Sequence, residues 1–189
     1  LNGFKSFAEK ADFLIEDGLT GIVGPNGCGK SNIVESLRWA MGETSAKSMR
    51  GSGMEDVIFS GTSNKASKNI AEVTIEVENK DKEGPVQYRD HDQIQIKRKI
   101  EKDKGSKFYI NGKEVRARDA QMFFADLSTG AHSPSMISQG RIGALVTAKP
   151  TDRRAILEEA AGISGLHVRR HEAELRLGAA ENNLKRADE

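Results

Sequence analysis

The chain has 189 residues, of which 37% are hydrophobic and 30% are charged, and this length is sufficient for one domain with a sizeable core. Its formal net charge is +1, so bulk charge does not favour nucleic acid as a partner, and any DNA contact needs a local basic patch. The single cysteine excludes an internal disulfide framework. The sequence has neither a membrane-length apolar run nor a hydrophobic signal core, so we expect a cytoplasmic protein that does not contact membranes.

The first expected element is a buried strand over residues 19–23 (LTGIV), a short apolar run that leads directly into a glycine-rich turn. A helix is expected over residues 31–41, where apolar residues recur at the spacing of one helical face and Gly42 ends the pattern. Residues 45–62 are rich in glycine and predict a loop, with a short strand at residues 57–59.

An antiparallel meander is expected in the middle of the chain. Residues 70–77, 94–100 and 108–110 alternate between apolar and polar side chains, and the dipeptide Asn111-Gly112 is a strong hairpin signal. Residues 78–92 are interpreted as an exposed connection. The basic stretch IKRKI within the second strand is interpreted as its polar face.

The remainder predicts helices. A helix is expected over residues 119–127, then a loop, then a helical stretch through Glu158. From residue 164 to residue 189 apolar residues follow a seven-residue repeat, with Arg170 as the one polar exception. The repeat indicates the beginning of a coiled-coil arm or, alternatively, a surface helix packed on the domain. The pattern runs to the last residue and favours the arm, and we expect the chain to be part of a longer protein. The repeat positions are Leu166, Ala173, Leu177, Ala180, Leu184 and Ala187.

Residues 24–31 (GPNGCGKS) match the phosphate-loop pattern G-x-x-x-x-G-K-[ST] in full. Glycines allow backbone N–H groups to converge on phosphate oxygens, and the following helix presents its positive N-terminal end to the same anion. Lys30 can reach the β and γ phosphates, while the Ser31 hydroxyl can coordinate Mg²⁺. We therefore predict nucleotide contacts from Gly24, Pro25, Asn26, Gly27, Cys28, Gly29, Lys30 and Ser31.

Hydrolysis needs more than this loop, namely an acidic residue at the end of a second strand and a group that orients the attacking water. The nearest match to such a strand is MFFAD at residues 122–126, which lies in an expected helix and is interpreted as a core helix face. The stretch LSTG at residues 127–130 lacks the second glycine of an ATP-binding-cassette signature. The sequence thus contains a phosphate loop without the carboxylates of hydrolysis. An autonomous P-loop kinase or GTPase would need its own carboxylate.

Four stretches taken together resemble one family. They are GFKSFAEK, GPNGCGKSNIVESLRWAMGE, SMRGSGMEDVIFSGT and ISQGRIGALVTAKPTDRRAILEEAAGI. In this order they are similar to the N-terminal half of the ATPase head of bacterial SMC (structural maintenance of chromosomes) proteins. The resemblance implies an α/β P-loop NTPase of ATP-binding-cassette type, with a mixed or antiparallel sheet in residues 1–163. In this family the Walker B acids and signature motif come from the C-terminal half, so the chain alone is expected to be inactive.

The resemblance also implies site residues for ATP and Mg²⁺. It extends the nucleotide contacts to Asn32 and adds Arg50, which matches an arginine that approaches nucleotide phosphate; the alternative is a solvated loop arginine. Gln139, in ISQGRI, would reach Mg²⁺ and the attacking water, so that Lys30 and Gln139 form the catalytic pair and Ser31 and Gln139 the metal contacts. The alternative for Gln139 is a loop glutamine without a role, and for Cys28 a small residue that simply fits.

The implied partners are the C-terminal half of the same head, a second head in a homodimer, a kleisin with its accessory subunit, and double-stranded DNA without base specificity. The implied function is ATP-driven head engagement and hydrolysis for chromosome condensation and segregation at the nucleoid. Candidate DNA contacts are Arg116 and Arg118, with Lys65 and Lys68 as a second group; solvated charges are the alternative. A split-head DNA-repair ATPase and a coiled-coil module with a vestigial nucleotide site remain as rival functions.

Overall fold

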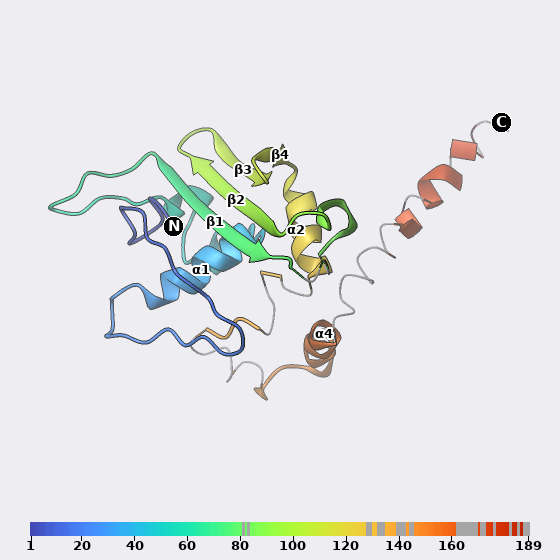
Figure 1. Cartoon of the computed structure of the whole chain (residues 1–189), viewed down its shortest axis with the longest axis horizontal. Helices are drawn as coiled ribbons and strands as arrows, with labels where there is room; N and C mark the ends of the chain where they lie inside the picture. Colours follow the sequence, from blue (N-terminus) through green and yellow to red (C-terminus); the bar gives the residue numbers. More distant parts are fainter. Residues whose placement is uncertain are drawn as a thin grey trace.

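The structure is a computed structural model of the whole chain (Figure 1). It describes residues 1–80, 82, 84–127, 130–131, 135–138, 143, 146–161, 170, 173–175, 177–181, 183–184 and 186. A four-stranded sheet forms the centre of this part of the chain, and two helices cover one of its faces. The protein is therefore of the α/β class, as its sequence predicts.

The strands are β1 (Ile70–Glu78), β2 (Gln93–Glu101), β3 (Gly105–Ile110) and β4 (Lys113–Val115). They lie in the order β1-β2-β3-β4, and each neighbouring pair is antiparallel. Asn111 and Gly112 have φ angles of 49° and 79° in the two-residue turn between β3 and β4, as a type I′ hairpin requires. The predicted meander and its turn are confirmed.

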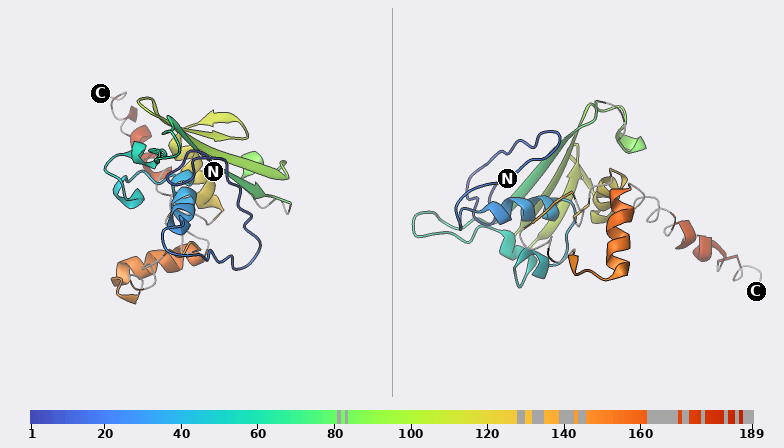
Figure 2. Two further views of the ribbon diagram at one scale, coloured as in Figure 1. Left: turned by 90° about the vertical axis from the view of Figure 1, so that its left-hand side faces the viewer. Right: turned by 90° about the horizontal axis from the view of Figure 1, so that it is seen from below.

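The inner face of the sheet is covered by α1 (Lys30–Ala40) and α2 (Ala117–Asp126). Helix α1 packs against β1 and β2, whereas α2 packs against β3, and Figure 2 shows both helices on the same side of the sheet. Both helices confirm the sequence prediction. Further described helical elements include α4 (Pro150–Ala160) and three short 3₁₀ turns, η1 (Lys47–Met49), η2 (Met54–Val57) and η3 (Val86–Tyr88).

The core beneath the sheet has two neighbouring parts, and partly buried Ile75 of β1 contacts both. The first part joins the N-terminal segment and α1 to β1 and β2; its buried residues are Phe4, Trp39, Ala40, Met49, Val57, Ile58, Ala71, Val73 and Ile100. The second joins the sheet to α2 through Ile94, Ile96, Ile110, Phe123 and Phe124. Burial of Phe123 and Phe124 on α2 confirms that MFFAD is a core helix face.

One strand residue contradicts the sequence interpretation. The stretch IKRKI is not simply the polar face of β2, because Arg98 is 3% exposed and lies on the inner face. Its guanidinium stacks on Trp39 and Phe108, with its Cζ atom 4.5 and 4.6 Å from the two ring centroids. It donates hydrogen bonds to the carbonyl oxygens of Trp39 and Glu43 and to the Ser106 hydroxyl. Hydrogen bonds and aromatic faces replace water around this charge, so the cation is retained inside.

The strand predicted over residues 19–23 is not formed. Leu19 is 96% exposed and Val23 is 93% exposed, and nearby Phe13, Leu14, Ile15 and Ile22 are also exposed. A strand needs a hydrogen-bonded neighbour, and no described strand runs beside these residues. We call residues 13–23 the apolar entry segment, because they lead into the glycine-rich turn.

Two smaller predictions are partly wrong. Residues 57–59 are buried, but they form only an isolated bridge between Ile58 and Phe4 instead of a strand. The connection over residues 78–92 is not wholly exposed, because the Asn79 side chain is buried and binds backbone groups within the same connection, including the carbonyl oxygen of His91 and the N–H of Gly84. A buried amide that satisfies backbone groups orders a polar segment that composition alone assigns to solvent.

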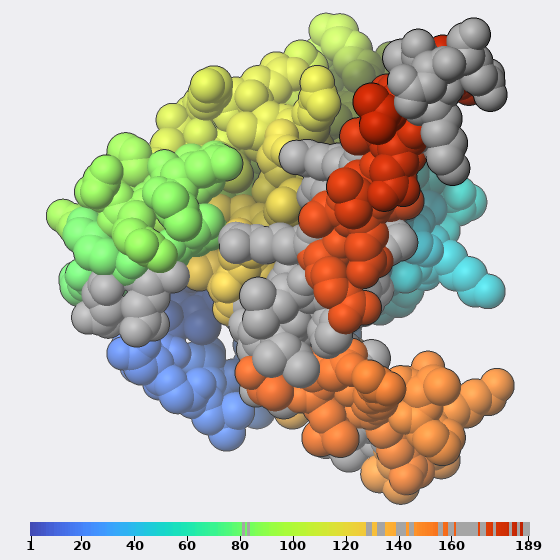
Figure 3. Space-filling view, turned by 90° about the vertical axis from the view of Figure 1, so that its right-hand side faces the viewer, coloured from blue at the N-terminus to red at the C-terminus, as the bar shows by residue number. Residues whose placement is uncertain are grey.

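The described residues beyond position 170 lie away from the sheet (Figure 1). Figure 3 shows α4 in orange and these later residues in red at the surface. Leu175, Leu177 and Leu184 are exposed, so this stretch presents apolar side chains to solvent. Among the described residues, none of the helices has the length and apolar character needed to cross a membrane.

Candidate functional site

The phosphate loop is an exposed turn at the N-terminus of α1. Gly27 and Gly29 have φ angles of 83° and 92°, which side chains disfavour, so glycine is required for this path. Lys30 is the first residue of α1, and Ser31 follows it on the exposed side of the helix. Gly24, Pro25, Asn26 and Cys28 complete the turn, so the contiguous motif is assembled as one loop at a helix N-terminus.

The Lys30 ammonium group lies inside this loop. Its Nζ donates to the carbonyl oxygens of Gly24 at 2.6 Å and Pro25 at 2.5 Å, and lies 4.0 Å from the Cys28 Sγ. The side chain therefore bridges the beginning of the loop and the helix. An anion entering the loop would compete with two carbonyl oxygens for the same cation.

Asn32 connects the loop helix to two other segments. Its Nδ2 donates to the Ser6 hydroxyl at 2.8 Å, and its Oδ1 accepts a hydrogen bond of 2.8 Å from Nη2 of Arg50. Predicted nucleotide residues Asn32 and Arg50 are thus brought together beside the first turn of α1. Arg50 itself follows η1 and has a positive φ of 53°.

A buried carboxylate lies next to this pair. Glu35 of α1 is 8% exposed, and its two oxygens bind different cations. Oε2 is 2.5 Å from the Lys5 Nζ, and Oε1 is 2.5 Å from the Arg50 Nε. Lys5 also donates to the carbonyl oxygen of Met49. Sequence reasoning missed Glu35, Lys5 and Ser6, because their positions in helix and loop give no signal of a shared contact.

The loop that carries Arg50 is held by a second carboxylate. Asp56 accepts hydrogen bonds from the Gly53 N–H at 2.9 Å and from the N–H and hydroxyl of Ser52 at 2.6 and 2.9 Å. These bonds, with the Gly53 amide contributing most, lower the pKa of the Asp56 carboxyl below its usual value. The charged form of Asp56 is therefore the one that stabilises the turn after Arg50.

The donor set around Ser31 suits magnesium only in the presence of phosphate. The described residues contain no group of three or more His, Cys, Asp or Glu side chains that could hold a metal by themselves. Mg²⁺ binds readily through one or two protein oxygens together with substrate phosphates and waters, which fits an exposed hydroxyl beside a phosphate loop. Gln139, the other predicted metal contact, lies outside the described residues.

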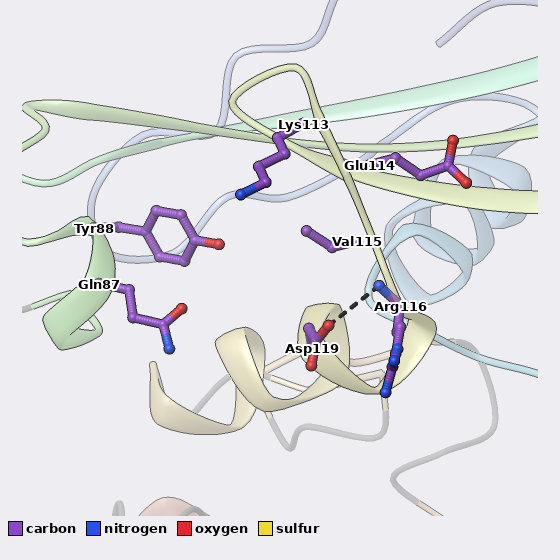
Figure 4. A pocket seen from close by; sticks show the side chains of 7 residues that line it. All are labelled: Gln87, Tyr88, Lys113, Glu114, Val115, Arg116 and Asp119. Atoms are coloured by element: carbon purple, nitrogen blue, oxygen red, sulfur yellow. Dashed lines mark hydrogen bonds between the residues drawn. The ribbon is translucent and has the colours of Figure 1, made fainter.

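The structure does not bring the two groups of candidate DNA contacts together. Lys65 and Lys68 lie in the loop before β1, where Lys65 forms an ion pair of 2.6 Å with Glu9 of the N-terminal segment. Arg116 and Arg118 lie instead at the N-terminus of α2 (Figure 1). Figure 4 shows the pocket beside Arg116, where acidic side chains accompany the basic ones. Its lining residues are Gln87, Tyr88, Lys113, Glu114, Val115, Arg116 and Asp119.

Comparison with known proteins agrees with this geometry. Residues 1–141 match the RecF/RecN/SMC N terminal domain family. The chromosome partition protein Smc of Rhodopseudomonas palustris is 58% identical over 189 residues, which cover all of this chain and 16% of that protein. The chain thus spans about a sixth of the length of the Smc relatives that it matches.

Solved structures give the same result for the fold. The Smc head domain of Pyrococcus furiosus, with an extended coiled coil and bound to the C-terminal domain of ScpA, has a TM-score of 0.76 at 32% identity, covering 98% of this chain and 46% of that one. A structure from work on ATP-driven dimerization and DNA-stimulated activation of SMC ATPases has a TM-score of 0.71 at 30% identity, covering 84% and 94%. The chain therefore belongs to the RecF/RecN/SMC N-terminal domain family and has the fold of an SMC ATPase head.

Proposed function

We propose that this chain is the ATP-binding N-terminal half of an SMC head, which acts with its C-terminal half and a second head in chromosome condensation and partition. The observation that carries the proposal is the phosphate loop at the start of α1, joined to an entry segment that exposes its apolar residues. An exposed apolar segment that no described strand pairs with, leading into a phosphate loop, is what one half of a split site would present. The identity to Smc proteins along the whole chain supports the same assignment.

The apolar entry segment would bind the C-terminal half of the same head. Leu14, Leu19 and Val23 are 81%, 96% and 93% exposed, and burying each such side chain contributes about 1.5–3 kcal/mol. Pairing with a strand from the other half would also satisfy the backbone groups of residues 19–23. In this arrangement the other half supplies the Walker B carboxylates and the signature motif, so the chain alone would not hydrolyse ATP.

In the bound state, the N–H groups of the loop from Gly24 to Asn32 would surround the phosphates. Lys30 would leave the carbonyl oxygens of Gly24 and Pro25 to bind the β and γ phosphates, and Arg50 would contact phosphate from the side of α1. Ser31 and Gln139 would hold Mg²⁺, which neutralises charge on the phosphates. Gln139 would also orient the attacking water, so that hydrolysis proceeds when a second head closes the site.

The remaining assignments concern partners. The Pyrococcus furiosus head binds the C-terminal domain of ScpA, and we propose a kleisin of this kind, with its accessory subunit, for this protein. Residues 164–189 would begin the coiled-coil arm, to which exposed Leu177 and Leu184 contribute an apolar stripe. Double-stranded DNA would bind through phosphate contacts at Arg116, Arg118, Lys65 or Lys68, and the protein would act in the cytoplasm at the nucleoid.

Reconstitution tests the proposal. The chain is mixed with the C-terminal half of its head, and ATP hydrolysis is measured for the wild type and for Lys30→Ala. We expect hydrolysis only in the mixture, and its loss in the variant. Turnover by the chain alone would indicate an autonomous P-loop enzyme. ATP binding by the complete protein without hydrolysis under any condition would indicate a coiled-coil module with a vestigial site.

A further inference from the structure

The buried carboxylate of Glu35 joins three segments that are separate in sequence. Its Oε2 binds Lys5 of the N-terminal segment at 2.5 Å, and its Oε1 binds Arg50 of the loop after η1 at 2.5 Å. Glu35 itself lies in α1, the helix that begins at Lys30. A carboxylate that is 8% exposed needs such partners, because an unpaired buried charge is strongly destabilising. The two ion pairs therefore fix the relative positions of the three segments.

Only one edge of the Arg50 guanidinium is used in these contacts. Nε binds Glu35, and Nη2 on the same edge donates to the Asn32 Oδ1 at 2.8 Å. The Arg50 side chain remains 59% exposed, and the described residues offer its Nη1 no hydrogen-bond acceptor. A planar guanidinium held along one edge keeps its other N–H groups in a fixed direction, and these groups suit a phosphate oxygen.

The charges of the cluster also favour an anion. Two cations, Lys5 and Arg50, share the single negative charge of Glu35, so the three side chains together carry a positive charge beside the first turns of α1. Lys5 is 13% exposed at its side chain and offsets the carboxylate from the inner side. Without Lys5, the Glu35 carboxylate would oppose the approach of phosphate by like-charge repulsion.

We propose that Glu35 is the positioning residue for Arg50: it holds the guanidinium beside the phosphate loop with its free edge directed to bound nucleotide. This inference rests on the proposed ATP-binding function and deepens it. Glu35 does not touch the nucleotide; it acts through Arg50. Its loss and the loss of Arg50 should therefore have the same effect on nucleotide binding, and the two effects should not add.

A double-mutant cycle in the complete head tests this inference. ATP affinity is measured by titration calorimetry for Glu35→Gln, Arg50→Ala and the combined variant, with Glu114→Gln as a matched control. Glu114 also pairs with a lysine, Lys107 at 3.0 Å, but lies on β4, outside the site. We expect each single substitution in the site to weaken ATP binding about tenfold, the order expected for one charge-assisted contact, and the combined variant to be no weaker than Arg50→Ala.

Additive losses, about hundredfold in the combined variant, would overturn the inference, because a general structural effect of Glu35 persists without Arg50. Unchanged affinity in Glu35→Gln would also overturn it. Should Glu35→Gln fail to fold, Glu35→Asp takes its place in the cycle, since it keeps the charge and moves the anchor by one methylene group. Failure of the wild type to bind ATP, or full affinity in Lys30→Ala, would instead refute the proposed function.

Discussion

Replacing Arg98 by Met would remove the buried cation between the sheet and α1 while keeping most of the side-chain volume. The carbonyl oxygens of Trp39 and Glu43 accept from the guanidinium at 2.6 and 2.7 Å, and both lie where α1 ends. Methionine can fill the space between Trp39 and Phe108, but it has no donor for these oxygens. The substitution thus isolates the hydrogen bonds and the cation–π contacts from the packing.

The magnitude follows from three opposing effects. The Glu43 carbonyl oxygen without the guanidinium costs about 2 kcal/mol. The Trp39 carbonyl oxygen, which also accepts from the Gly42 N–H at 3.1 Å, and the Ser106 hydroxyl each lose a hydrogen bond of about 1 kcal/mol, and a desolvated cation–π contact contributes about 2 kcal/mol. Against this, burial lowers the pKa of Arg98 to about 10, and this shift corresponds to about 3 kcal/mol of desolvation that methionine avoids. Glu43 partly opposes that shift. We therefore expect Arg98→Met to lower the free energy of unfolding by about 3 kcal/mol.

Urea unfolding of the chain, followed by fluorescence of Trp39, the single tryptophan, measures this change. Lys99→Met serves as the control, because Lys99 is the next residue of β2 and lies on the opposite face; its effect should stay within about 0.5 kcal/mol. A loss below about 1 kcal/mol in Arg98→Met would refute the reasoning. It would mean that water or relaxed backbone satisfies the Glu43 carbonyl oxygen when the guanidinium is absent.

Three further outcomes are expected. Alkylation of Cys28 by iodoacetamide should slow at saturating ATP, whereas equal rates with and without ATP would place the thiol outside the occupied loop. The folded pKa of Asp56 lies below the ordinary value of 3.8, so its stabilising effect is present above pH 3.8 and is lost as the pH falls through the folded pKa. The free energy of unfolding of Asp56→Asn should therefore fall less over this pH range than that of the wild type. Parallel plots of unfolding free energy against pH for the two proteins would contradict the assignment. Leu19→Ser should weaken association with the C-terminal half, measured by sedimentation, about tenfold and leave the chain's own stability nearly unchanged. Leu184→Ser, which also changes an exposed leucine but lies outside the entry segment, should leave this association intact.

The sheet and its helices could be predicted because their patterns report local burial. Alternation in β1 and β2 distinguishes the two faces, and the helical spacing in α1 indicates its inner side. The same alternation contained the signal for Arg98: it has the parity of Ile96 and Ile100, both on the inner face. The polarity of the side chain points to solvent and its place in the alternation points to the core, and in IKRKI the alternation is the correct guide.

The contacts of the candidate site could be predicted only where they are contiguous. Residues 24–31 form one loop because backbone geometry links them directly. The Lys5, Glu35 and Arg50 contacts depend on how distant segments pack, which no local pattern encodes. The position of the entry segment could not be predicted for a similar reason. An apolar run indicates that burial of its side chains is favourable, but it does not say which other segment will cover them.

The contacts that hold α1 in place lie at its C-terminal end and along its flank, but not at the segment that leads into its N-terminus. This difference connects nucleotide binding to assembly. Arg98 holds the C-terminal end of the helix, and Glu35 holds its flank. The residues that lead into the phosphate loop, in contrast, are exposed. Pairing of the entry segment with the C-terminal half should therefore order the loop from its unsupported side and raise its affinity for ATP. Because such coupling is reciprocal, saturating ATP should strengthen the association of the two halves by the same factor, and an association constant unaffected by ATP would show that the loop is already ordered in the chain alone.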